Sequence, residues 1–137
     1  MSRTVIVKEN GHGRYQQDII VGDRHRLVAD EPVEVGGDDM GPAPFDFLLA
    51  SLGACTSMTV RMYAQRKEWP LKQVQVAVRL DKREDESGHK VERIERVITL
   101  EGDLSDEQRQ RLLEIANKCP THRFLQQPAR IDSRLAE

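Results

Sequence analysis

The sequence of 137 residues is poor in aromatic side chains and carries little net charge. Aromatic residues make up 4% of the chain, which leaves few rings on which nucleic-acid bases could stack. The formal net charge is −2, so the chain lacks the positive field that phosphate binding needs. Both absences argue against nucleic acid as a partner.

Long apolar stretches are also missing. The N-terminus, MSRTVIVKEN, has no apolar core of signal-peptide length. The longest run without a charged residue, from Phe47 to Val60, is too short to cross a bilayer. We therefore expect a cytoplasmic protein without membrane contact. The sequence has only two cysteines, which in a reducing compartment do not form a structural disulfide framework. A bond between them would be transient.

The first forty residues predict a small antiparallel sheet. Residues 4–8 and 14–21 contain β-branched clusters, and the Asn-Gly-His-Gly segment between them suits a hairpin turn. Residues 25–29 are expected to add a third strand. A Gly-rich loop, residues 35–42, then leads into the next element.

A long helix is predicted from Pro44 to about Arg66, because proline suits a first helical turn and apolar residues then recur at steps of three and four. The recurring residues are Phe45, Leu48, Leu49, Leu52, Cys55, Thr59 and Met62. The central turns are small or apolar on all sides, which implies burial on more than one side. Wrapping by a second copy of the chain would provide that burial, so we expect an intimate homodimer.

Two further strands are predicted at residues 74–80 and 91–100, joined by a charged loop at 81–90. Ser105 and Gln108 have the spacing of a capping box at the start of a helix that ends near Cys119.

A short helix through Leu125 and a last strand around residues 129–135 complete the prediction. The result is an α+β fold in one domain, residues 1–137.

The two cysteines are the candidate chemical groups. Taken alone, Cys55 in the helix stripe reads as a small core residue. Cys119 precedes Pro120 at a helix junction, where free backbone amides can favour a thiolate. Together with Cys55, the Cys119-x-x-His122 segment would also offer three zinc ligands, but the close-spaced ligand pairs typical of zinc sites are missing. We expect no metal, and we expect His122 to lie on a helix surface or in a pocket wall.

Two segments resemble the OsmC/Ohr family of organic hydroperoxide reductases and stress-induced OsmC-like proteins. They are DEPVEVGGDDMGPAPFDFLLASLGACTSMTVRMYA and LLEIANKCPTHRFL. The most specific parts are the Gly-Pro-x-Pro before the long helix, the Ala-Cys within it and the Cys-Pro about sixty residues later. The resemblance covers nearly the whole chain. It implies an α+β fold in which small antiparallel sheets wrap around long central helices in an intertwined homodimer.

The same resemblance implies a thiol peroxidase that acts on organic hydroperoxides. Cys55 would attack the O–O bond and become a sulfenic acid, and Cys119 would condense with it to form a disulfide. An external dithiol, lipoyl-type in the family, would restore both thiols, and no cofactor is required. The pocket would be lined by Phe45, Leu48, Leu52 and His122, which favours organic over hydrogen peroxide.

The resemblance also calls for an arginine, because burial alone raises the pKa of a thiol and leaves it inert. The candidates are Arg14, Arg24 and Arg26, of which we favour Arg26. The sequence departs from the family at one position. Phe45 stands where peroxidase members commonly have the glutamate that holds this arginine, and Asp46 follows it.

Two alternative functions remain open. The same dimeric pocket could bind a small apolar or thiol-containing ligand without turnover. A hot-dog thioesterase also wraps a sheet around a central helix, and it would use a carboxylate such as Asp46.

Overall fold

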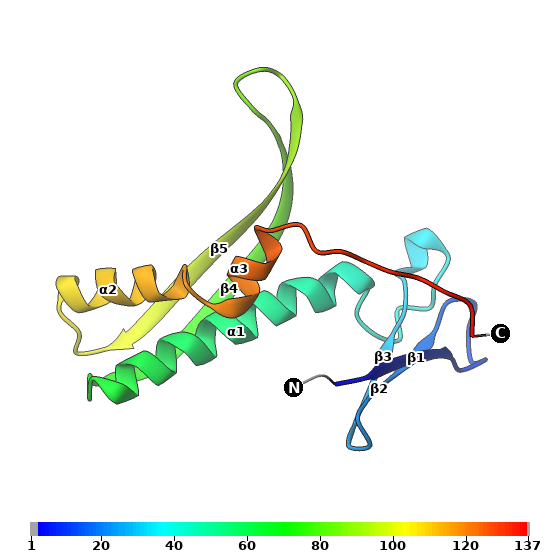
Figure 1. The fold of residues 1–137 in the computed structure, drawn as a ribbon, viewed down its shortest axis with the longest axis horizontal. Coiled ribbons are helices and arrows are strands. Elements are labelled where there is room, and N and C mark those ends of the chain that lie inside the picture. Colours follow the sequence, from blue (N-terminus) through cyan, green and yellow to red (C-terminus); the bar gives the residue numbers. More distant parts are fainter. Residues whose placement is uncertain (1–2, 137) are drawn as a thin grey trace. The chain divides into compact units, whose positions relative to one another are not determined.

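The computed structural model describes residues 3–136 and has the predicted α+β composition, with two small antiparallel sheets and three α-helices in that range (Figure 1). The chain forms two compact units, Met1–Leu48 and Leu49–Glu137. The count of one domain for residues 1–137 stays a prediction. No helix among residues 3–136 has both the length and the apolar character needed to span a membrane.

The first unit is built on a three-stranded antiparallel sheet in the order β1-β2-β3. Its strands are β1 (Val5–Glu9), β2 (Gln17–Val21) and β3 (His25–Ala29), so all three predicted strands are confirmed. The second strand starts later than predicted. Residues 10–16 form the connection, which is closed by a hydrogen bond from the Asn10 amide to the Gln16 carbonyl at 3.3 Å.

The loop before the long helix is organised by one buried carboxylate. Asp30 is 2% exposed and accepts hydrogen bonds from the backbone amides of Glu31, Asp38 and Met40. A short 3-10 helix, η1 (Val33–Val35), lies within this loop. The carboxylate satisfies amides that would otherwise be unpaired, and this fixes the path of the Gly-rich segment towards Pro44.

The long helix α1 (Pro44–Arg66) has the predicted bounds. At its start, the Asp46 carboxylate accepts a hydrogen bond from the Ala43 amide at 2.9 Å, the bonding expected at a helix N-terminus.

The buried face of α1 differs from the predicted stripe. Its buried residues lie four apart: Leu52, Thr56, Val60 and Ala64. The stripe through Cys55 and Thr59 is therefore wrong by one residue, because the core of the second unit lies on the Thr56 side. In this single chain α1 is buried along one face only.

A two-stranded antiparallel sheet forms the backbone of the second unit. It consists of β4 (Leu71–Glu84) and β5 (Lys90–Gly102), and both strands are longer than predicted. The predicted charged loop at 81–90 is too long, because residues 81–84 and Lys90 belong to the strands. Charged residues pair within and across the two strands there, as Arg83 with Asp81 and Arg79 with Glu95. Only a short turn between Glu84 and Lys90 remains (Figure 1).

Two helices follow, α2 (Asp106–Ala116) and α3 (Pro120–Leu125). The capping box is confirmed, since Ser105 and Gln108 bind each other's backbone amides. The predicted last strand is wrong. Residues 129–135 have no regular structure, and Ile131 is 85% exposed, so nothing pairs with this segment.

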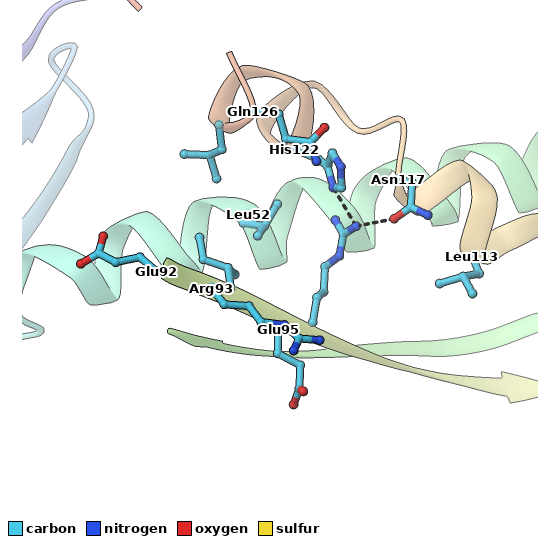
Figure 2. Close-up of a pocket in the computed structure, with 11 residues that line it drawn as sticks. Leu52, Glu92, Arg93, Glu95, Leu113, Asn117, His122 and Gln126 are labelled. Atoms are coloured by element: carbon cyan, nitrogen blue, oxygen red, sulfur yellow. Dashed lines mark hydrogen bonds between the residues drawn. The ribbon is translucent and has the colours of Figure 1, made fainter. Parts of the chain in front are cut away.

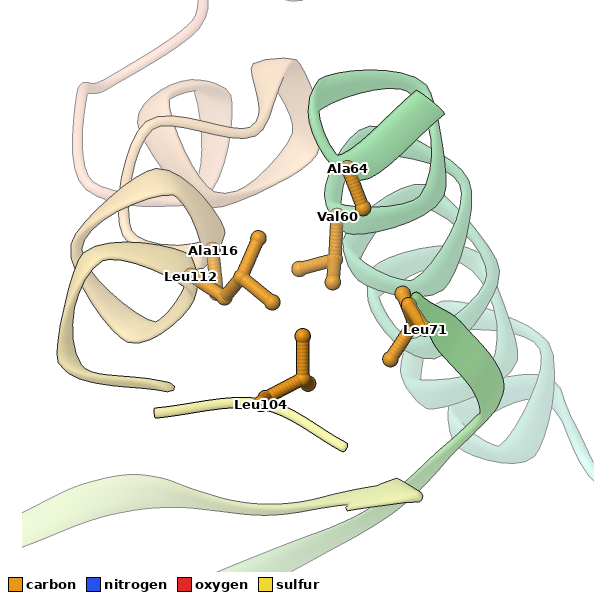
Figure 3. Packing of buried hydrophobic residues seen from close by; sticks show 6 residues of the cluster. All are labelled: Val60, Ala64, Leu71, Leu104, Leu112 and Ala116. Carbon is orange, nitrogen blue, oxygen red and sulfur yellow. The ribbon is translucent and has the colours of Figure 1, made fainter. Parts of the chain in front are cut away.

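The core of the second unit joins α1, β4 and α2. It consists of Val60, Ala64, Leu71, Leu104, Leu112 and Ala116 (Figure 3). Nearer the N-terminus of α1, the helix approaches β4 closely at Gly53. A Cβ atom on Gly53 would lie 3.3 Å from Cγ2 of Val78, closer than ordinary van der Waals contact. This packing sets the position of the helical turns that carry Cys55 and Thr56.

Candidate thiol site

The structure brings the two cysteines together in the second unit. Cys55 lies in the middle of α1 and is half-buried, whereas Cys119 directly precedes α3 and is buried. Neither forms a disulfide. The hydroxyl of Thr56, which follows Cys55 on α1, lies 3.8 Å from Cys119 Sγ, and Cys119 is one of the groups that lower the pKa of Cys55. Two residues far apart in sequence therefore belong to one site.

The Cys55 thiol is adjusted towards its ionised form. Burial acts first and raises its pKa. Hydrogen bonds from the Thr121 side chain and backbone, from Cys119 and from Thr59 outweigh burial, so the pKa of Cys55 lies below its ordinary value. Because the thiolate is the reactive species, these contacts favour a nucleophilic sulfur at Cys55.

Cys119 has different surroundings. It is 0% exposed and serves as the N-cap of α3, where its Sγ accepts a hydrogen bond from the His122 amide at 3.3 Å. The Thr56 hydroxyl lies 3.8 Å from the same sulfur. The free backbone amides predicted at this junction are therefore used, at least in part, by the Cys119 side chain.

Arg96 of β5 provides the cation beside Cys119. Its Nη1 lies 4.0 Å from Cys119 Sγ and donates to Thr56 Oγ1 at 2.8 Å and to the Ala116 carbonyl at 3.3 Å. Its Nη2 donates to Asn117 Oδ1 and His122 Nδ1, both at 2.9 Å (Figure 2). One guanidinium thus ties β5 to α1, to the end of α2 and to α3.

Sequence reasoning missed Arg96, although a signal was present. Ile94, Ile98 and Leu100 are partly buried residues on alternate positions of β5, and Arg96 occupies the position between the first two. A charge within an alternating apolar set is unusual, because an isolated buried charge is costly unless it is bonded. Thr56 and Thr121 were missed as well, because a hydroxyl in a helix gives no comparable signal.

A cavity of about 560 Å³ lies next to this network (Figure 2). Its lining includes apolar residues of three helices and the polar groups around Arg96: Leu52, Leu113, Leu125, Arg96, Asn117 and His122. Burial and the positive charge of Arg96 lower the pKa of His122, against a weaker opposing hydrogen bond with Gln126. His122 is therefore neutral near pH 7, which agrees with Nδ1 accepting a hydrogen bond from Arg96.

The predicted site residues fall into two groups. Cys55, Cys119, Leu52 and His122 belong to the second unit, and Leu52 and His122 are among the residues that line the cavity. Phe45, Leu48 and Arg26 belong to the first unit. Phe45 is 60% exposed and Arg26 is an exposed residue of β3. Their part in the site stays a prediction.

A zinc site of the kind considered from the sequence is not formed by the described residues. Within residues 3–136, no three His, Cys, Asp or Glu side chains gather closely enough to hold a metal ion.

Comparison with known proteins identifies relatives of this fold. The sequence model of the OsmC-like protein family matches residues 36–134. No curated protein matches the chain. Solved structures share the fold at low sequence identity, and three of them are described below.

The OsmC-like protein of Mycoplasma pneumoniae is 20% identical, with a TM-score of 0.69 over 91% of this chain and 86% of that one. The organic hydroperoxide resistance protein OsmC of Legionella pneumophila is 17% identical, with a TM-score of 0.68 over 91% and 89%. The organic hydroperoxide resistance protein OhrB of Bacillus subtilis is 19% identical, with a TM-score of 0.63 over 90% of each chain.

The family match includes both cysteines, the whole of α1 and the β4–β5 sheet that carries Arg96. The chain therefore belongs to the OsmC family.

Proposed function

We propose that this protein is a thiol-dependent peroxidase that reduces organic hydroperoxides. The observation that carries the proposal is a half-buried Cys55 thiol whose pKa lies below its ordinary value, next to Thr56, whose hydroxyl lies 3.8 Å from the second thiol, Cys119. A peroxidase of this kind needs one ionised, accessible sulfur and one sulfur within bridging reach. The names of the Legionella pneumophila and Bacillus subtilis relatives support the same substrate class.

The proposed reaction has two steps. The Cys55 thiolate attacks one oxygen of ROOH and breaks the O–O bond, which releases ROH after protonation and leaves Cys55 as a sulfenic acid. Cys119 then attacks the Cys55 sulfur, and the hydroxyl group leaves as water, so a Cys55–Cys119 disulfide forms. An external dithiol, lipoyl-type by family resemblance, donates two electrons to restore both thiols.

Organic peroxides are the proposed substrates because of the cavity beside the site. Charged residues of β5, Glu92, Arg93 and Glu95, form one part of its lining, and Leu52, Leu113 and Leu125 form an apolar part. The apolar part suits the hydrocarbon portion of an organic hydroperoxide, which hydrogen peroxide lacks. Phe45 and Leu48 are proposed to extend this wall, and Arg26 is proposed as a further cation for the Cys55 thiolate.

An intertwined homodimer is the proposed assembly. Phe45, Met58 and Met62 of α1 are each 60% exposed in the single chain, which is much apolar surface for one helix. We also place the protein in the cytoplasm, because two cysteines do not form the disulfide framework typical of small secreted domains. Equilibrium sedimentation should give twice the chain mass, and a monomer at all concentrations would contradict the dimer.

A thiol count tests the function directly. Reduced protein is mixed with one equivalent of cumene hydroperoxide, and free thiols are counted with a chromogenic disulfide reagent. We expect both thiols to be lost and a linked peptide that contains Cys55 and Cys119 to appear in the digest. Hydrogen peroxide at the same concentration should react more slowly. Retention of both thiols after an equivalent of cumene hydroperoxide would reject the proposal.

A ligand-binding protein is the second candidate. Polar side chains such as Asn117 and His122 line the cavity together with apolar ones, as in a binding pocket for a small molecule. A binder would keep its ligand affinity in Cys55→Ser and would not consume peroxide in the unsubstituted protein.

A further inference from the structure

The charge of Arg96 is not neutralised by a carboxylate. None of the ion pairs among residues 3–136 includes Arg96, whereas Arg79 and Arg83 of the same sheet both pair with carboxylates. The acceptors around its guanidinium are all neutral: a hydroxyl, a carbonyl, an amide oxygen and an imidazole nitrogen. The positive charge therefore remains effective at the Cys119 sulfur 4.0 Å away.

The guanidinium is also fixed in place. Its four acceptors come from α1, the end of α2 and α3, so it cannot turn away from Cys119 without losing several bonds at once. A preorganised cation stabilises charge that develops on a neighbouring atom more effectively than a mobile one. Within the second unit, the groups that act on the Cys55 thiol are two threonines and Cys119, none of which carries a positive charge.

The two sulfurs also differ in how easily an external thiol can reach them. Cys119 is 0% exposed, whereas Cys55 is half-buried, so an external thiol reaches the Cys55 sulfur more easily. In thiol–disulfide exchange the attacked sulfur takes the new partner, and the other sulfur leaves as a thiolate. The reaction is faster when the leaving thiolate is better stabilised.

We propose that Arg96 is a positioning residue that sets the direction of disulfide reduction, so that the reductant attacks Cys55 and Cys119 leaves. This inference rests on the proposed function. The first thiolate of the reductant bonds to Cys55 Sγ, and the S–S bond electrons pass to Cys119 Sγ, whose charge Arg96 stabilises. The second thiol of the reductant then attacks the reductant sulfur that is bonded to Cys55 in the mixed disulfide. Cys55 leaves as a thiolate, and the reductant departs as a cyclic disulfide with two electrons transferred.

The test begins from a disulfide made without peroxide. Diamide oxidises the two thiols, and the oxidised protein is then mixed briefly with cysteamine. This monothiol cannot close a cyclic disulfide, so the mixed disulfide accumulates until a second cysteamine molecule attacks it. After an acid quench, free thiols are alkylated, and mass spectrometry of the digest locates the adduct. We expect at least about ten times more cysteamine on Cys55 than on Cys119.

Substitutions separate the charge from a structural role at the end of α2. Arg96→Met should slow cysteamine-dependent reduction at least about tenfold, and Arg96→Lys, which keeps the charge, should stay within about threefold of the unsubstituted protein. Arg79→Gln removes a surface arginine from the same sheet and should have no effect. Circular dichroism melts check that each variant folds. If Arg96→Met does not fold, the position of the cysteamine adduct in the unsubstituted protein and the reduction rate of Arg96→Lys still test the inference.

An adduct mainly on Cys119 would overturn the inference, and so would a folded Arg96→Met protein that is reduced at the original rate. Peroxide consumption is measured separately on the same preparations. Its absence, together with an adduct on Cys55 and a slow Arg96→Met variant, would reject the peroxidase and leave the role of Arg96 standing.

Discussion

The surroundings of Cys55 and those of Cys119 differ in kind. Hydroxyl groups of Thr121 and Thr59 and one backbone amide act on Cys55, which is reachable from outside. A guanidinium and a different amide act on Cys119, which is fully enclosed. Neutral donors and partial exposure suit a sulfur that attacks a substrate. A fixed positive charge and full burial suit a sulfur that meets only its internal partner.

Removing each sulfur in turn should give the largest contrast. We expect Cys55→Ser to lower peroxide consumption on the order of a hundredfold or more, because the nucleophile is lost. Cys119→Ser should consume one equivalent and then stop, since no disulfide can form. Peroxide loss followed over several turnovers checks both variants. Equal behaviour of the two would mean that the sulfurs do not have separate roles.

Next to Cys119, a substitution of Thr56 should lower the stability of the fold. The Thr56 hydroxyl donates to the Leu52 carbonyl at 2.7 Å and accepts from Arg96, and valine has the same shape without these bonds. We expect Thr56→Val to lower the free energy of unfolding by about 1–3 kcal/mol, because it leaves buried donors and acceptors unpaired. Urea denaturation measures it, with the exposed Thr99→Val as control. A loss no larger than that of the control would contradict the bonding described.

On the Cys55 side, the corresponding change should act on reactivity. Thr121→Val removes the side-chain hydrogen bond that most lowers the pKa of Cys55, so that pKa should rise. Because the thiolate reacts and the thiol does not, the midpoint of the iodoacetamide rate against pH should move to higher pH. Thr59→Val should move it less. A midpoint unchanged in Thr121→Val would remove Thr121 from the site.

The smallest effect is expected from acid at His122. Burial and Arg96 lower its pKa in the folded state, so between that value and about 6.5, the ordinary histidine pKa, the unfolded chain binds more protons. Stability is then lost as pH falls below about 6.5. Unfolding free energies at several pH values should show this slope in the natural chain and a shallower one in His122→Gln. Identical slopes would show that His122 does not contribute.

Sequence reasoning succeeded where a local rule was enough. Pro44 and the apolar spacing fixed both ends of α1, and the Ser105–Gln108 pair fixed the start of α2. It failed where a partner decided the outcome. The apolar spacing along α1 was compatible with two neighbouring faces, and only the packing of β4 and α2 selects the Thr56 face over the Cys55 face.

The residues of the candidate site show the same contrast between local rules and packing partners. Both cysteines could be named from the sequence, but their proximity came from family resemblance, because no spacing rule brings α1 and α3 together. Arg96 was hidden because its role depends on strand register. Opposite Val78 on β4, it faces the same side as Ile94 and Ile98, and only that placement brings it to Cys119.

The absence of a side chain at Gly53 has a consequence two residues further along the helix. Alanine there would require Val78 or α1 itself to give way by a few tenths of an ångström. Cys55 and Thr56 lie on the same turns of α1. A shift of the helix would therefore move both the Cys55 sulfur and the Thr56 hydroxyl, which accepts a hydrogen bond from Arg96. The lack of a methyl group at Gly53 therefore sets the distance between β4 and the part of α1 that carries the Cys55 sulfur.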